Sequence, residues 1–96
     1  MNLDRKLKLG KRFTIVDLDD EIVFIPSDDC EGHSELYKAI DFTSITICRW
    51  LHSGRSPREI INHLVNIFNV EYSLVESDTI NFIQALLQKG VFYEQD

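Results

Sequence analysis

The chain has 96 residues, which suits one small domain with its own core and is too short for two such domains. Hydrophobic residues make up 44% of the sequence and two residues are proline, which excludes a disordered chain. Residues 1–12 carry a net charge near +4, while residues 13–96 carry a net charge near −10. Because DNA binding draws most of its affinity from neutralised phosphates, no nucleic-acid surface is expected outside the first twelve residues.

The basic start of the chain, residues 1–11, is expected to form an arm, and residues 12–93 a single domain. Such an arm is either a solvated terminus or a surface that docks on an acidic partner. Cys30 and Cys48 match no metal-binding or redox spacing, so we expect free thiols. Since no signal sequence or long apolar run occurs, the sequence predicts a cytoplasmic protein that does not span a membrane.

A β-hairpin is predicted near the start of the domain. Residues 12–18 and 21–25 are rich in β-branched and aromatic side chains, and Asp19 and Asp20 between them provide a two-residue turn. The second strand is expected to end at Pro26, because proline has no N–H to donate to a strand ladder.

A polar loop and a third strand are expected next. Residues 27–34 include several acidic residues and one glycine, which is typical of a loop. Residues 35–40 alternate in polarity, which predicts a short third strand at the edge of the sheet. An exposed edge of this kind can accept a strand from another molecule.

The first helix is predicted to follow this strand directly. Asp41 is a good N-cap, because its carboxylate can accept a free N–H of the first turn. The helix is expected to run to about His52 and to stop at residues 53–55, which include a glycine. Residues 45–47 favour β-structure, so local propensity alone does not decide whether this segment is a helix.

The second helix has the clearest start signal in the chain. Ser56 is placed to cap it, Pro57 to occupy its first position, and Glu59 to complete a capping box. Asn69 suits a left-handed helix end. The apolar positions that predict one buried face are Ile60, Ile61, Leu64, Val65 and Phe68.

The third helix is predicted to open at Ser77 and Asp78 and to end at Gly90. It has no Lys or Arg between Val75 and Gln88, which is unlike a helix that reads DNA. A surface helix needs only one apolar stripe, but this one carries two neighbouring stripes. Both stripes are buried in the core, or one of them lines a groove beside the edge strand. The stripes are Phe82 with Leu86, and Ile80 with Ile83 and Leu87.

Three parts of the sequence carry a family resemblance. They are the third strand running into residues 40–43, the helix start at residues 56–61 and the closing helix at residues 78–91. With the hairpin, they resemble the PqqD-like family, the precursor-peptide recognition domains of pathways that modify ribosomally made peptides. The resemblance spans residues 12–93. It implies an α+β, winged helix-turn-helix-like fold, in which an N-terminal three-stranded antiparallel sheet is followed by three helices.

The same resemblance implies that the leader segment of a precursor peptide adds as a strand beside the third strand, in a cleft walled by the third helix. It leaves open which stripe of that helix faces the cleft. The strand residues implied to pair with the leader backbone are Leu36, Tyr37, Lys38 and Ala39. The residues implied to form the helical wall are Ile80, Ile83, Gln84 and Leu87.

The family also implies a partner for the bound leader. The protein would act as a peptide chaperone that delivers the leader to a separate modifying or processing enzyme, such as a radical SAM enzyme, a cyclase or a protease. It would be a monomer or a weak dimer, and it would bind neither nucleic acid nor membranes. Met1 and the complete domain favour a free-standing protein.

The sequence predicts no catalytic chemistry, no cofactor and no metal. Cys30 and His33 offer two zinc ligands where four are normal. The acidic turn at residues 17–21 lacks the glycine and the spacing of a calcium loop. His52 and His63 have no partner nucleophile, and no glycine-rich phosphate loop occurs.

Three functions therefore remain open from the sequence. The first is a non-catalytic peptide-binding module. The second is a winged-helix DNA-binding regulator, which would need a basic recognition surface. The third is a small accessory subunit that binds a protein partner through the same groove. The first and third differ in whether the ligand is a short linear peptide or a folded surface.

Overall fold

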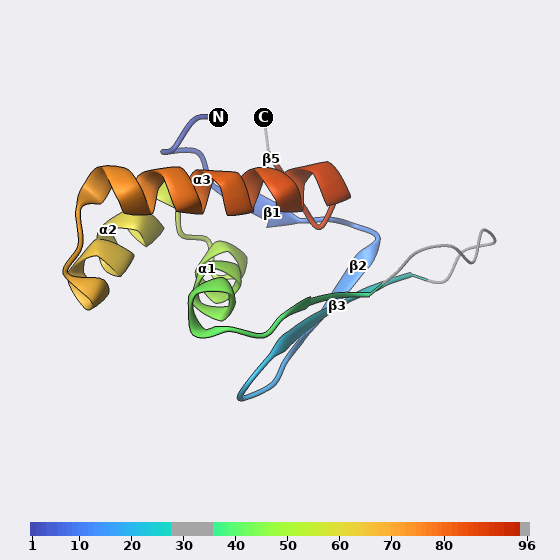
Figure 1. Cartoon of the computed structure of the whole chain (residues 1–96). Coiled ribbons are helices and arrows are strands. Elements are labelled where there is room, and N and C mark those ends of the chain that lie inside the picture. Colours follow the sequence, from blue (N-terminus) through green and yellow to red (C-terminus); the bar gives the residue numbers. More distant parts are fainter. Residues whose placement is uncertain (28–35, 95–96) are drawn as a thin grey trace.

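The structure is a computed structural model, and it describes residues 1–27 and 36–94. The predicted loop with Cys30 and His33 therefore lies almost wholly outside the described residues. Eight helices and strands follow one another in the described part of the chain (Figure 1). They are β1 (Leu7–Leu9), β2 (Phe13–Asp17), β3 (Ile22–Pro26), β4 (Tyr37–Ala39), α1 (Phe42–His52), α2 (Pro57–Phe68), α3 (Tyr72–Lys89) and β5 (Phe92–Glu94).

Three strands form the antiparallel sheet that the sequence predicts. Their order is β2-β3-β4, so β3 is central and β4 lies at one edge of this sheet. β2 pairs with β3 from Phe13 opposite Pro26 to Asp17 opposite Ile22. The α+β class, with a three-stranded antiparallel sheet followed by three helices, is therefore confirmed.

The helix ends follow the capping signals in the sequence. The Asp41 carboxylate accepts a backbone N–H of the first turn of α1 at 2.8 Å. At the start of α2, Ser56 and Glu59 form the predicted capping box, with bonds of 2.9 and 3.3 Å. Asn69 (φ 55°) and Gly90 (φ 77°) end α2 and α3 in the left-handed conformation.

One hydrophobic core lies between the three helices and the inner face of the sheet. Successive strand residues point to opposite faces, so Ile22 and Phe24 enter this core together. The ring of Phe24 meets that of Phe92 edge to face, with centroids 5.7 Å apart, which joins the sheet to the segment after α3. The largest side chains with almost no exposed surface also include Ile47, Leu51, Ile60, Ile61, Leu64, Ile83, Leu86 and Val91.

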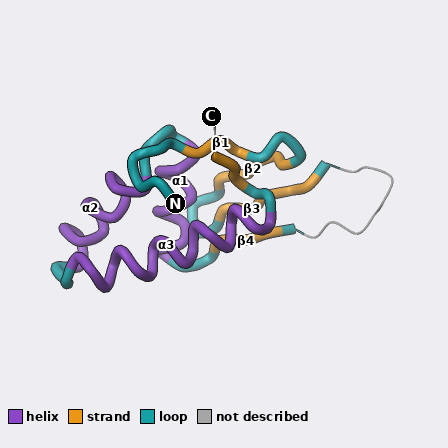
Figure 2. The backbone as a smooth tube through the Cα atoms, turned by 90° about the horizontal axis from the view of Figure 1, so that it is seen from above, coloured by secondary structure: helices purple, strands orange, loops and turns teal. Residues whose placement is uncertain are grey.

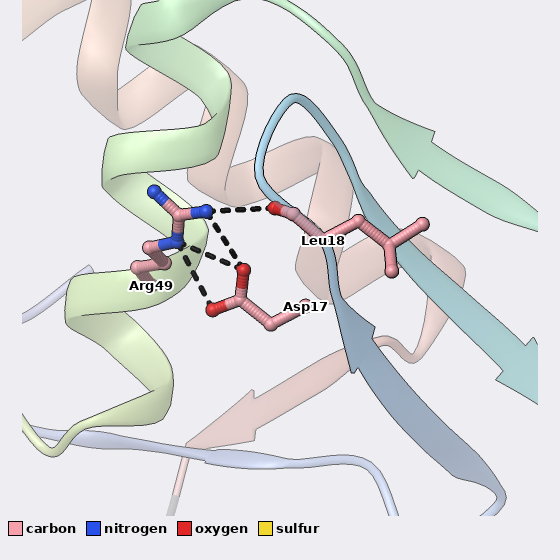
Figure 3. Close-up of polar contacts among 3 residues, drawn as sticks. All are labelled: Asp17, Leu18 and Arg49. Atoms are coloured by element: carbon pink, nitrogen blue, oxygen red, sulfur yellow. Dashed lines mark hydrogen bonds and ion pairs between the residues drawn. The ribbon is translucent and has the colours of Figure 1, made fainter.

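An ion pair fixes the hairpin against α1 (Figure 3). The Nε of Arg49 lies 3.0 Å from both carboxylate oxygens of Asp17, and its Nη2 lies 2.8 Å from Oδ1. Nη2 also donates to the carbonyl oxygen of Leu18 at 2.8 Å. Because β4 leads directly into α1, this contact ties both ends of the sheet to the same helix.

Of the two interpretations of the basic start of the chain, a solvated terminus does not fit the structure. β1 pairs with β5 in antiparallel register, Leu9 lying opposite Phe92. Leu7 is 3% exposed, and the backbone N–H of Arg58 donates to the Leu3 carbonyl oxygen at 2.9 Å. The basic side chains point outward from a segment whose leucines belong to the core, so net charge alone was misleading.

The third helix begins earlier than the capping residues predict. α3 starts at Tyr72, and Ser77 and Asp78 lie inside it. Its N-cap, Glu71, makes no side-chain capping bond. Val75, in the second turn, is 8% exposed. Packing of the first turns against the core therefore favours a helix that starts before the capping residues Ser77 and Asp78.

Candidate functional site

The open edge of β4 is the starting point of the candidate site. β4 pairs only with β3 in the described part of the chain, with Phe24 opposite Tyr37 and Ile22 opposite Ala39. The backbone groups on its other side have no strand partner there. An unpaired edge presents N–H and C=O groups to any strand that can lie against it.

The hydrogen-bonding pattern shows which groups of β4 face outward. In an antiparallel pair, hydrogen-bonded residue pairs alternate with non-hydrogen-bonded ones. The Leu18 N–H donates to the Glu21 carbonyl oxygen at 2.9 Å, and from there alternate residues of β3, including Val23, bond toward β2. Their neighbours Ile22 and Phe24 therefore bond toward β4.

The same alternation continues into β4. Tyr37 and Ala39 direct their backbone groups toward β3, because they lie opposite its β4-facing residues. Lys38 lies between them, and its N–H and C=O face the open side. Its side chain is exposed, whereas Ala39 is buried and Tyr37 half-buried on the core side. Lys38 is thus the central residue of the open edge.

One flank of α3 lies beside this edge. The carboxyl-terminal end of α3 comes near the start of β4 in the view of Figure 2, while Figure 1 shows α3 in the layer above the sheet. The ammonium of Lys89 sits 5.9 Å from the centre of the Tyr37 ring. Residues three and four apart share a flank of a helix, so Ala85 and Phe82 lie on the same flank as Lys89.

The residues expected to form the helical wall do not lie on the Lys89 flank of α3. Ile83 is fully buried and belongs to the row that faces the core, together with Val75, Thr79 and Leu86. Helical spacing places the other expected wall residues beyond that row, on the flank away from Lys89. Sequence periodicity found two stripes but held no signal for which one faces the edge strand. The expected wall residues on the far flank are Ile80, Gln84 and Leu87.

A pocket of about 640 Å³ opens at the Tyr37 end of the β4 edge. Three segments that are distant in the sequence line it: the corner between β1 and β2, the start of β4, and the end of α3 with β5. Three of its residues are cationic, and among the described residues no acidic one lines it. The lining residues are Gly10, Lys11, Arg12, Phe13, Leu36, Tyr37, Lys89, Gly90, Val91 and Tyr93.

Close backbone packing shapes the floor of this pocket. The Gly10 N–H donates to the Val91 carbonyl oxygen at 2.7 Å. A Cβ at Gly10 would lie 2.1 Å from the carbonyl oxygen of Gly90, so no larger residue fits there without moving the backbone. This corner could not be predicted from the sequence, since nothing local indicates that residues 7–13 meet residues 89–93.

Apolar side chains are exposed at the opposite end of the β4 edge. Ile40 is 69% exposed and Phe42 is 60% exposed, directly after the strand. The Phe42 ring meets that of Phe68 edge to face, with centroids 6.1 Å apart. The edge thus runs from a cationic pocket at Tyr37 to an apolar surface at Phe42.

The described residues offer little else that could perform chemistry. They contain no group of three or more His, Cys, Asp or Glu side chains that could hold a metal ion. Burial raises the pKa of the Cys48 thiol to about 12, which disfavours the thiolate. His63 stacks on Trp50 at 4.0 Å between ring centres.

No helix in the described part of the chain is long and apolar enough to cross a bilayer.

The fold has a counterpart among solved structures. No family model and no curated protein matches the sequence. A solved structure described as TbiB1 in complex with the TbiA(beta) leader peptide matches with a TM-score of 0.75 and 24% identity. The match covers 88% of this chain and 93% of that one. At this identity, the likeness shows that the two chains share a fold.

Proposed function

We propose that this protein is a non-catalytic peptide-binding module that captures the leader segment of a precursor peptide as an added strand along β4. The observation that carries this proposal is the open backbone edge at Lys38, with a pocket at one end to which the end of α3 contributes Lys89. Backbone pairing would supply affinity, and the pocket and the apolar surface would supply selectivity.

Two similarities support a leader peptide as the ligand. The sequence resembles the PqqD-like family of precursor-peptide recognition domains, and the fold is that of TbiB1, which was solved with a leader peptide. By the same analogy, the bound leader would be presented to a separate modifying or processing enzyme in the cytoplasm. The domain itself would supply recognition and no catalytic group.

A DNA-binding role is disfavoured by the surface of α3. Between its first residue, Tyr72, and Gln88, this helix carries no Lys or Arg. The cations of the pocket lie at the far end of the helix, beside β4. A winged helix that reads DNA needs its cations along the helix that enters the groove.

The test is a titration of isotope-labelled protein with the leader of a short reading frame encoded beside its gene, followed by amide NMR. We expect saturable shifts at Lys38, its neighbours in β4, and the Phe82–Lys89 flank of α3. A DNA duplex serves as the control. Saturable shifts with DNA alone would contradict the proposal, and so would leader-induced shifts confined to surfaces away from β4.

A matched pair of variants separates backbone pairing from side-chain effects. Lys38→Pro removes the outward N–H while leaving the bonds of Tyr37 and Ala39 to β3 in place. Lys38→Ala removes the same side chain but keeps the N–H. We expect Lys38→Pro to weaken leader binding about tenfold or more relative to Lys38→Ala, through the lost bond and the added ring. Equal affinities would exclude strand addition at this edge.

A further inference from the structure

The pocket at the end of the β4 edge concentrates positive charge on an acidic protein. The net charge of the chain is −6, yet Lys11, Arg12 and Lys89 line this one pocket. They come from the corner after β1 and from the end of α3, so the fold brings them together. A local charge opposite to that of the molecule selects ligand groups that the rest of the surface repels.

Two of these cations are not neutralised by the protein within its described part. The ion pairs found there use Lys38, Arg49, Arg55 and Arg58. Lys11 takes part in none of them, and Lys89 contacts the ring of Tyr37. Arg12 has an interaction of its own within the protein, so Lys11 and Lys89 are the cations of the pocket that a ligand would engage.

The pocket also has a defined place relative to an added strand. Side chains of neighbouring strands that lie opposite each other point to the same face of the sheet. A ligand residue opposite Tyr37 would therefore point to the side of the sheet that carries α3, where Lys89 and the pocket lie. A residue opposite Lys38 would point to the other face.

We infer that the peptide bound at β4 carries an acidic side chain, Asp or Glu, opposite Tyr37, and that Lys11 and Lys89 bind its carboxylate. This inference rests on the proposed function, and it names a chemical feature of the ligand that strand addition alone does not require. The pocket of about 640 Å³ is large enough for such a side chain together with water.

The experiment is a selection of random twelve-residue peptides displayed on phage against the full chain. Wild-type protein is compared with Lys11→Glu/Lys89→Glu and with a control of equal net charge, Lys6→Glu/Arg55→Glu. The control residues act on Glu59 at the start of α2, so they change the total charge without changing the pocket. Thermal melts of all three proteins establish that they are folded.

Wild type and the control are expected to enrich Asp or Glu at one peptide position, and the pocket variant is expected to lose that enrichment or to enrich Lys or Arg instead. Replacing the selected Asp or Glu by Asn or Gln should weaken binding to wild type about fivefold to tenfold, and less at high salt. Peptides that bind at β4 without acidic enrichment would overturn the inference, as would an enrichment that survives in the pocket variant.

If the proposed function itself is wrong, the same experiments give a different result. If wild type enriches no peptide, or if Lys38→Pro binds the selected peptides as well as Lys38→Ala does, strand addition at β4 is wrong and the inference falls with it. If the selected peptides respond to Lys38→Pro but not to pocket charge, only the acidic anchor is wrong.

Discussion

The ion pair between Arg49 and Asp17 links the hairpin to α1, and it depends on pH. The hydrogen bond from Arg49 holds the pKa of the Asp17 carboxyl below its ordinary value of 3.8. A carboxyl with a lowered pKa in the folded state stabilises the fold above its ordinary pKa. That stabilisation is lost as the pH falls through the folded-state pKa.

We therefore expect Asp17→Asn to be less stable than wild type at neutral pH and equally stable once the wild-type carboxyl is protonated. Urea unfolding at several pH values from neutral to about pH 2 measures the difference. Because both side chains are partly exposed, the difference should be small and should shrink with added salt. Asp20→Asn, in the same turn, is the control. A difference that persists at the lowest pH would contradict this account of the pair.

Among the elements, the local signals in the sequence were sufficient for most boundaries. The capping box at Ser56, the left-handed ends at Asn69 and Gly90, and the hairpin turn are all set by residues within a few positions of each other. The start of α3 at Tyr72 could not be predicted in this way, because no capping bond marks it and the nearby Val75 is buried through contacts that are distant in the sequence.

The candidate site, too, could be predicted from the sequence only in part. The edge strand was predictable from alternation in the sequence, and its position at the edge of the sheet is confirmed. The helix flank beside it was not predictable, since Phe82 and Ile83 are equally apolar and only the crossing of α3 over the sheet distinguishes them. The pocket required β1 to pair with β5, a contact between the two ends of the chain.

The two flanks of α3 can be separated by a pair of substitutions. Ala85→Glu places a charged side chain on the flank shared with Lys89, where Ala85 is half-buried. We expect it to weaken leader binding about tenfold or more while the domain stays folded, since a carboxylate there repels an acidic ligand bound near Lys89. Binding is measured by calorimetry and folding by circular dichroism.

Ile83→Ala is the counterpart, because Ile83 has no exposed surface. It should cost about 2–4 kcal/mol of stability by leaving a cavity, and it should affect binding only as far as the fold is weakened. If Ile83→Ala abolished binding without loss of stability, or if Ala85→Glu bound the leader normally, the Phe82–Lys89 flank would not be the one that meets the ligand.

At the scale of the whole molecule, the pairing of β1 with β5 joins the two ends of the chain beneath the candidate site. Leu7 is buried to 3% exposure, while Lys8 beside it is exposed and lies opposite Tyr93. Gly10 then packs against the end of α3, so the same segment positions the pocket. The first eleven residues therefore contribute to stability and to the shape of the site together.

Leu7→Ala tests this dependence against Lys8→Ala in the same strand. Loss of the buried leucine should cost about 2–4 kcal/mol, which lowers the melting temperature of a domain of this size by about 10 °C or more. Lys8→Ala should melt close to wild type, because its side chain is exposed. Thermal unfolding measures both, and amide exchange at Phe92 reports whether β1 and β5 stay paired. If Leu7→Ala melted like wild type, the start of the chain would be the solvated arm that its charge suggests.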